Sequence, residues 1–317
     1  MGRRYALQEF LITMDIMMPL LLMLAVGWML GRIGLMKEPV ASRMNQLVFR
    51  VFLPVLLFNN IRTLNISEAP GLGFAAYCFF GVLGIFLLAW FIVPHFEHDP
   101  RKSGVMVQGI FRSNFAILGV ALMTAMYGQS GIAAVTLGLP LVVPLNNILA
   151  VVALSSGGGK TNPRELLKSV ITNPLIVAAA LGAVMLLIRL PLPTALDNVC
   201  NQLANLASPV SLLVLGASLK WQGVKDNRNQ LIWTVLLKQL VIPVVMVGLA
   251  VLLGFHHEEL GVMVILFGAP AAVSSYPMAE AMGCDGTLAA SQIVLTTVFS
   301  MGTLFGLIYA GKLLGVL

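Results

Sequence analysis

The fold of this chain is decided by residues 261–286, GVMVILFGAPAAVSSYPMAEAMGCDG. The stretch is apolar and long enough to cross a bilayer, yet Pro270 and Pro277 interrupt it, with a Ser-Ser-Tyr run between them. A membrane-spanning helix tolerates such a break only where other protein or water satisfies the freed backbone groups. Interrupted helices at mid-membrane depth are where secondary transporters hold their substrates. The stretch therefore predicts one half of a substrate site.

The composition predicts a polytopic helical membrane protein. Of the 317 residues, 58% are hydrophobic and only 10% are charged, whereas soluble domains carry about 25% charged residues. The alternating ten-residue segments of a membrane β-barrel are missing, and no basic run interleaved with aromatic residues suggests nucleic acid as a partner. Cys78, Cys200 and Cys284 are too far apart for a zinc site or a disulfide framework. We expect no metal and no cofactor.

Long apolar runs predict ten spans, and the first is expected to be retained as a helix rather than removed as a signal peptide. The spans cover about 13–34, 41–61, 71–93, 104–127, 131–154, 166–189, 195–219, 230–253, 260–283 and 286–315. Lysine and arginine are unequally shared between the two sets of connections, with eleven on one side and five on the other. The richer side should be cytoplasmic. The sequence thus predicts a protein of the bacterial inner membrane with both termini outside.

A shift of 155 residues indicates an internal repeat. It superposes two prolines and three glycines on residues of the same type, as Pro19/Pro174, Pro54/Pro209, Gly27/Gly182, Gly128/Gly283 and Gly131/Gly286. We expect an N-terminal five-helix repeat at 1–154, a cytoplasmic linker at 155–165 and a C-terminal repeat at 166–317. Because five is odd, the second copy would be inverted in the membrane, as in many secondary transporters.

The same shift lays the interrupted segment 260–283 over 104–127, whose polar piece is FRSNFAILG, 111–119. Pro270 falls opposite Phe115, so both spans are expected to be broken and to cross near the midplane. Half-helix N-termini at such a crossing carry partial positive charge and favour an anion.

Three stretches resemble the auxin efflux carrier family of secondary transporters: LPVLLF at 53–58, FRSNFAILG at 111–119 and GAPAAVSSYPMAEAMGCDGTLAASQIVL at 268–295. The resemblance covers nearly the whole chain. It implies ten helices, outside termini, crossed broken helices 4 and 9, and a fold similar to the bile-acid/sodium symporters. It also implies an organic acid as substrate, including dicarboxylates or auxin-like acids. The sodium-site pattern of the bile-acid branch is not evident at 277–284, so a coupling proton is favoured over sodium.

The polar residues of the two broken spans are the candidate substrate ligands, with two asparagines of the fifth span beside them. Arg112 is deep enough to be expensive in lipid and could bind a carboxylate bidentately, or could pair permanently with Glu280. Asn114 could bind substrate or hydrogen bond between helices, and the two serines could bind substrate or the carbonyls freed by Pro277. The predicted substrate-binding residues are Arg112, Ser113, Asn114, Asn146, Asn147, Pro270, Ser274, Ser275 and Pro277.

The sequence leaves more than one role possible for most of three further charged residues and one pair of glycines. Glu280 is a candidate coupling carboxylate or an interfacial one, and Arg50 is a gating or structural candidate. Lys238, about a third of the way into span 230–253, is expected to snorkel to the interface. Gly27 and Gly31 could allow close helix packing or ease bending.

We therefore predict a secondary transporter that moves a small organic anion by alternating access. No enzyme motif occurs in the chain, although a membrane enzyme using Arg112 and Glu280 stays as an alternative. A channel or sensor with a carrier-type fold is the other alternative. Whether the protein forms a homodimer is left open.

Overall fold

The structure is a computed structural model that describes residues 2–63, 71–156, 164, 168, 171–189 and 191–317. Helices are the regular elements of these residues, together with one isolated β-bridge. Seven helical segments are long and apolar enough to cross a membrane. The prediction of an all-α polytopic membrane protein is confirmed. The predicted linker 155–165 lies largely outside the described residues.

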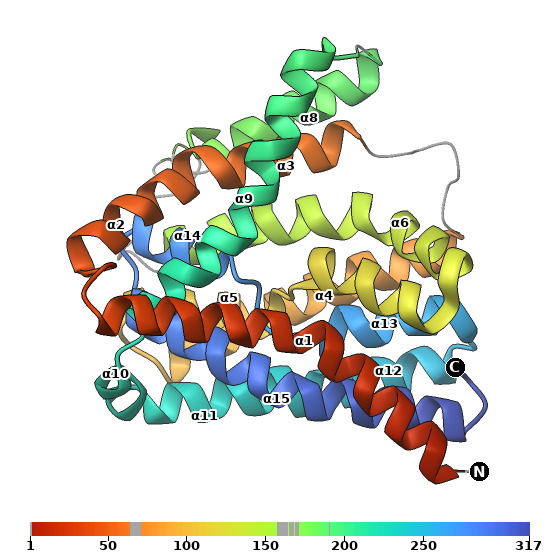
Figure 1. Ribbon diagram of the computed structural model, residues 1–317. Coiled ribbons are helices and arrows are strands. Elements are labelled where there is room, and N and C mark those ends of the chain that lie inside the picture. The colour runs from red at the N-terminus through yellow and green to blue at the C-terminus, as the bar shows by residue number, and fades with distance from the viewer. Residues whose placement is uncertain (1, 64–70, 157–163, 165–167, 169–170, 190) are drawn as a thin grey trace.

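The helices follow the apolar runs of the sequence closely (Figure 1). In chain order they are α1 (Gly2–Arg32), α2 (Glu38–Leu47), η1 (Val48–Phe52), α3 (Leu53–Arg62), α4 (Leu72–Ile92), η2 (Val93–His95), α5 (Pro100–Phe111), α6 (Phe115–Ser156), α8 (Pro174–Ile188), α9 (Thr194–Ser218), α10 (Trp221–Asp226), α11 (Arg228–Leu236), η3 (Leu237–Val241), α12 (Ile242–Leu252), α13 (His257–Gly268), α14 (Ser275–Ala281) and α15 (Gly286–Leu313). Gly128, with φ 61° and ψ −129°, bends α6 into two arms.

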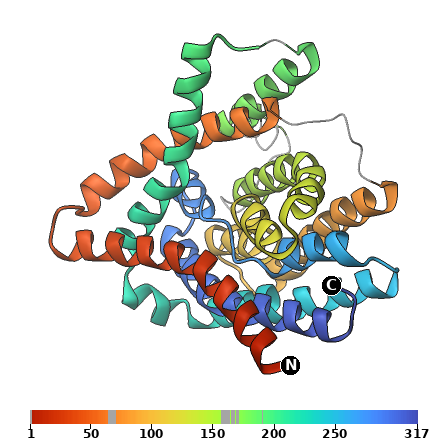
Figure 2. The same ribbon diagram turned by 45° about the vertical axis from the view of Figure 1, so that its right-hand side comes forward.

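The helices pack as two groups (Figure 2). The flanking group consists of α1, α2–η1–α3, α8 and α9, in which α1 packs on α9 and α3 packs on α8 and α9. The crossing group consists of α4, α5, α6 and α10–α15, with α6 on α13 and α5 between α4, α6 and α15. The two groups meet chiefly where α1 lies along α15.

Glycines let the flanking helices approach each other closely. A Cβ added at Gly27 would overlap the carbonyl oxygen of Leu213, and one added at Gly216 would overlap that of Leu24. Gly31 lies against Ala217 in the same contact. The close-packing interpretation of the Gly27–Gly31 pair is therefore the correct one, since small residues allow membrane helices to touch backbone to backbone.

Two π-helical turns precede prolines. Proline has no N–H and clashes with the carbonyl four residues earlier, so Pro54 and Pro243 each leave one carbonyl free, and η1 and η3 form at these places. The carbonyl freed by Pro243 belongs to Gln239, and it accepts a hydrogen bond of 2.6 Å from the Thr303 hydroxyl of α15. Such π-turns are frequent at functional sites.

Candidate functional site at the crossing of two broken helices

Both predicted interruptions are present in the structure. α5 ends at Phe111 and α6 begins at Phe115, with Arg112 in an extended conformation between them (φ −79°, ψ 122°). α13 ends at Gly268 and α14 begins only at Ser275. The polar run FRSN and the residues around Pro270 therefore cannot continue their helices.

The two extended stretches cross in contact with each other. Ser113 and Ala271 form an antiparallel β-bridge, and the Asn114 amide donates to the Pro270 carbonyl at 2.8 Å. On the other side of the strand pair, the Ala271 amide donates to the Thr296 hydroxyl of α15 at 3.1 Å. These bonds replace part of the lost helical pairing, which is the condition for irregular backbone inside a membrane.

The crossing has an asymmetric electrostatic environment. α5 and α13, each of twelve residues, end there, so each directs a partial negative charge of about half an electron at the crossing. α6 begins there, and its N-terminus supplies free amide donors that attract an anion. Negative and positive helix ends thus converge on one point inside the protein.

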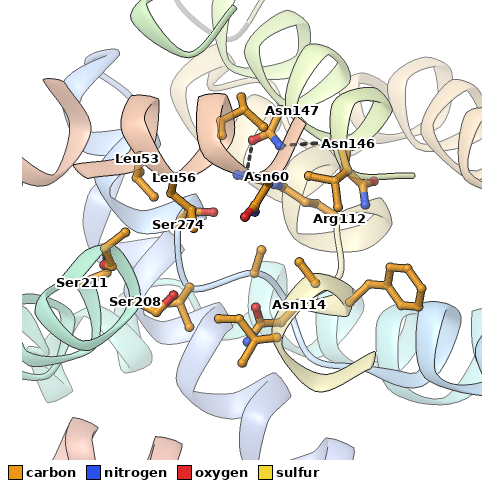
Figure 3. A pocket seen from close by; sticks show the side chains of 18 of the residues that line it. Leu53, Leu56, Asn60, Arg112, Asn114, Asn146, Asn147, Ser208, Ser211 and Ser274 are labelled. Carbon is orange, nitrogen blue, oxygen red and sulfur yellow. Dashed lines mark hydrogen bonds between the residues drawn. The ribbon is translucent and has the colours of Figure 1, made fainter. Parts of the chain in front are cut away.

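A cavity of about 80 Å³ opens between this crossing and the flanking group (Figure 3). This is several times the volume of roughly 10–15 Å³ that a cavity needs to hold one water molecule. Its polar lining comes from both groups: Arg112, Ser113, Asn114, Asn146, Asn147 and Ser274 from the crossing group, and Asn60, Ser208 and Ser211 from the flanking group. Its apolar wall includes leucines of α3 together with Phe115, Val143, Leu175 and Met278.

Arg112 is the charged residue of this cavity. Its side chain is only 4% exposed, and its guanidinium donates to the Asn147 side-chain oxygen and to the Met278 sulfur, each at 2.8 Å. A thioether is a weak acceptor and an amide is neutral. The structure pairs no described carboxylate with Arg112. The guanidinium charge is therefore buried but not neutralised.

Three further polar atoms of the cavity residues lack a partner. Within the described part of the chain, nothing hydrogen bonds to the hydroxyl of Ser113, the side-chain nitrogen of Asn114 or the side-chain oxygen of Asn146. An unsatisfied buried polar group costs about 1–3 kcal/mol. Such groups gathered around one cavity are what a polar ligand would satisfy.

The structure places the predicted residues unequally. Arg112, Ser113, Asn114, Asn146, Asn147 and Ser274 line the cavity, whereas Pro270, Ser275 and Pro277 are buried beside it without lining it. Glu280 and Arg50 are exposed and lie away from it, so Glu280 is not the partner of Arg112. Asn60, Ser208 and Ser211 were not predicted. Each of them is a residue with a hydroxyl or amide side chain inside an apolar run, and the same feature of the sequence led to the prediction of Asn146.

Lys238 does not snorkel as predicted. Its side chain is 1% exposed, on the face of η3 that packs against α5, α13 and α15. Snorkelling requires the ammonium to reach water along the helix surface, and burial against three helices prevents this.

Comparison with known proteins agrees with this architecture. A protein-family match described as membrane transport protein covers residues 12–165 and 160–308. A transporter of Methanocaldococcus jannaschii is 24% identical over 92% of this chain and 96% of its own length. The Escherichia coli transporter YfdV is 22% identical, covering 83% and 86%. A Rhizobium meliloti protein whose name proposes malonate transport is 22% identical, covering 93% and 94%.

Among solved structures, the sodium/proton antiporter MjNhaP1 of M. jannaschii has a similar fold. It superposes with a TM-score of 0.62 at 13% identity, over 98% of this chain and 99% of that one. The family match spans nearly the whole sequence and agrees with the resemblance carried by 53–58, 111–119 and 268–295. The chain is a multi-pass integral membrane protein that belongs to the membrane transport protein family of the auxin efflux carrier type.

Proposed function

We propose that this protein is a secondary transporter that carries a small organic anion across the inner membrane by alternating access. The observation that carries the proposal is the buried, unneutralised guanidinium of Arg112 in a cavity at the helix crossing. A buried positive charge is expensive unless it is paired. A carboxylate that entered the cavity would relieve that cost with bidentate, charge-assisted hydrogen bonds.

The size and lining of the cavity favour a short carboxylic acid. A volume of about 80 Å³ suits a compact mono- or dicarboxylate better than a large aromatic acid. The side chains of Asn114, Asn146 and Ser274 could hydrogen bond a second carboxyl group. The name of the Rhizobium relative points to the same class, since malonate is a short dicarboxylate.

The two helix groups supply a physical basis for alternating access. The cavity lies between them, so a displacement of one group against the other would change the side from which the cavity is reached. The first two predicted spans of each sequence half belong to the flanking group, and the last three belong to the crossing group. This division supports ten spans in two inverted five-helix repeats, with both termini outside.

Thermal-shift and uptake measurements test the proposal. Purified protein should be stabilised by one or more short carboxylates, and proteoliposomes should accumulate that acid with saturable kinetics. Arg112→Ala should bind the acid at least tenfold more weakly, because it removes the charge that faces the ligand.

Arg50→Ala is the matched control, since Arg50 is exposed and outside the cavity. It should bind the acid as the unmodified protein does. The proposal would be contradicted if Arg112→Ala transported the acid at the normal rate. It would also be contradicted if the uptake rate of the unmodified protein did not saturate as the acid concentration rises.

A further inference from the structure

Lys238 is a buried amine on a π-turn. It lies in η3, the turn that Pro243 forces on this segment, and only 1% of its side chain is exposed. An intramembrane ionisable residue is costly and generally marks an ion or substrate pathway. The anion cavity does not use this lysine, because no residue of α11, η3, α12 or α15 lines that cavity.

The surrounding contacts place Thr234, one turn before Lys238, beside the last turn of α5. Thr234 accepts a hydrogen bond of 3.1 Å from Gln292, and both side chains lie against Gly109 in the last turn of α5. One turn after Gln292, Thr296 binds the Ala271 amide of the crossing itself. Lys238 follows Thr234 by one turn in the same direction. η3 itself packs against α5, α13 and α15, and none of its residues lines the anion cavity.

The segment that carries Lys238 packs against two helices whose negative ends meet at the crossing. α5 and α13 both terminate at the crossing, and η3 packs against both. Their partial charges, about half an electron each, favour an ammonium in this position. The burial of Lys238 opposes it.

Among the described residues, no carboxylate forms a salt bridge with Lys238. Apart from Arg112, the titratable and charged groups of the helices packed around it lie towards their ends: Arg101 and Lys102 on α5, Arg228 on α11, His257, Glu258 and Glu259 on α13, and Lys312 on α15. None of these forms a salt bridge with Lys238 in the described chain. No described carboxylate therefore holds Lys238 permanently as an ammonium.

We propose that Lys238 is the proton-binding group that couples proton movement to anion movement. The inference rests on the proposed function. A carboxylate bound at Arg112 would add negative charge at the crossing, which favours the ammonium form of Lys238. The Lys238 amine then takes up one proton from the buffered aqueous phase and becomes an ammonium. By linkage, the proton at Lys238 strengthens anion binding by the same factor. Anion and proton would cross together as a symport with no sodium ion.

Calorimetric titration in buffers of different ionisation enthalpy tests this inference on the unmodified protein. Malonate is the first probe, followed by the best ligand of the thermal-shift screen. At about pH 7.5–8.5 the acid is fully ionised, so proton uptake on binding belongs to the protein. We expect uptake approaching one proton per anion and an affinity that falls by up to about tenfold per pH unit.

Two substitutions assign the proton. Lys238→Arg keeps a permanent charge and should bind the anion with no proton uptake and no pH dependence over this range. Lys238→Gln should bind more weakly, also without proton uptake. Lys225→Gln, a change of an exposed lysine on α10, should behave as the unmodified protein. A merely structural lysine would lower stability without changing the proton count.

The possible failures can be distinguished. An unmodified protein that binds no carboxylate overturns the proposed function and this inference with it. Binding without proton uptake overturns the inference alone, whether or not the variants fold. Proton uptake that persists in Lys238→Arg assigns the proton to another group and also overturns it.

Discussion

Arg112 is held by two neutral acceptors, and this determines how the residue can work. Its partners are the Asn147 amide oxygen and the Met278 sulfur. Neither removes the positive charge, so the ligand meets a guanidinium that is oriented but still electrostatically free. A permanent carboxylate in the same place would orient Arg112 equally well and would occupy the charge. An amide rather than an acid at position 147 therefore leaves the charge of Arg112 unpaired.

Asn147→Asp should convert the binding site into an internal ion pair. The new carboxylate would accept from Arg112 with a charge-assisted bond, roughly twice as strong as the neutral one. We expect the thermal unfolding midpoint to rise by about 2–4 °C, the equivalent of roughly 1 kcal/mol. Affinity for the anion should fall at least tenfold.

Asn147→Leu is the control, since it removes the same hydrogen bond without adding charge. It should lower stability by about 1–3 kcal/mol and weaken anion binding clearly less than Asn147→Asp does. An Asn147→Asp protein that binds the anion normally would show that the charge of Arg112 is not what the ligand recognises.

Part of the cavity could be predicted from sequence because polar residues are expensive in apolar runs. Arg112, Asn114, Asn146, Asn147 and Ser274 were found in this way. Asn60, Ser208 and Ser211 were missed because α3 and α9 carry other polar residues with a different task. Arg62, Asp197, Asn201 and Asn59 form a closed hydrogen-bonded ring between these helices. Sequence cannot tell which polar side chains face the cavity and which join two helices.

At the scale of elements, the α1–α9 contact holds the flanking group together. Gly27 lies on Leu213 and Gly216 lies on Leu24, so the two helices touch through their backbones on both sides. Neighbouring carbonyl oxygens cannot rotate away as a side chain can. Each glycine is therefore required for the separation of the two axes.

Gly27→Ala and Gly216→Ala should each lower stability by about 1–3 kcal/mol through overpacking. Thermal unfolding in detergent measures the loss. Gly248→Ala in α12 is the control, since an added Cβ there meets nothing within 4 Å, and it should be neutral or slightly stabilising because alanine favours a helix. Equal stability of Gly27→Ala and the control would mean that α1 and α9 can separate at little cost.

The breaks of the two crossing elements were predictable, whereas the π-turns were not. Pro270, Pro277 and the polar FRSN run each oppose a continuous helix by a local rule. The π-turns at Val48–Phe52 and Leu237–Val241 depend on how the surrounding helices accept a freed carbonyl. Thr303 does so for Gln239, from a position 64 residues away. For the same reason, the burial of Lys238 could not be deduced from its depth in the apolar run.

At the scale of the whole molecule, the described helices form a bundle with two opposite ends. α1 begins and α15 ends at one of them, with the turn before α13, while α2 and α10 lie at the other (Figures 1 and 2). The His257 amide donates to the Val316 carbonyl at 2.8 Å, which fixes the C-terminal residues beside that turn. The termini and residues 254–257 should therefore face the same side of the membrane.

The inverted arrangement can be tested at a pair of matched positions. His98 and His256 are both exposed, and each lies in the connection before a broken segment, α5 or α13. Under the 155-residue shift these connections correspond to each other, but an odd number of spans per repeat would put them on opposite sides.

In a chain with Cys78, Cys200 and Cys284 replaced, His256→Cys should react with a membrane-impermeant maleimide on intact cells. His98→Cys should react only after the inner membrane is opened, because the lysine- and arginine-rich connections stay in the cytoplasm. Replacing histidine by cysteine at both sites keeps the chemistry equal, so a difference in labelling reports sidedness alone. Labelling of both positions under the same condition would mean that the two halves are not inverted, and the alternating-access proposal would then lose its structural basis.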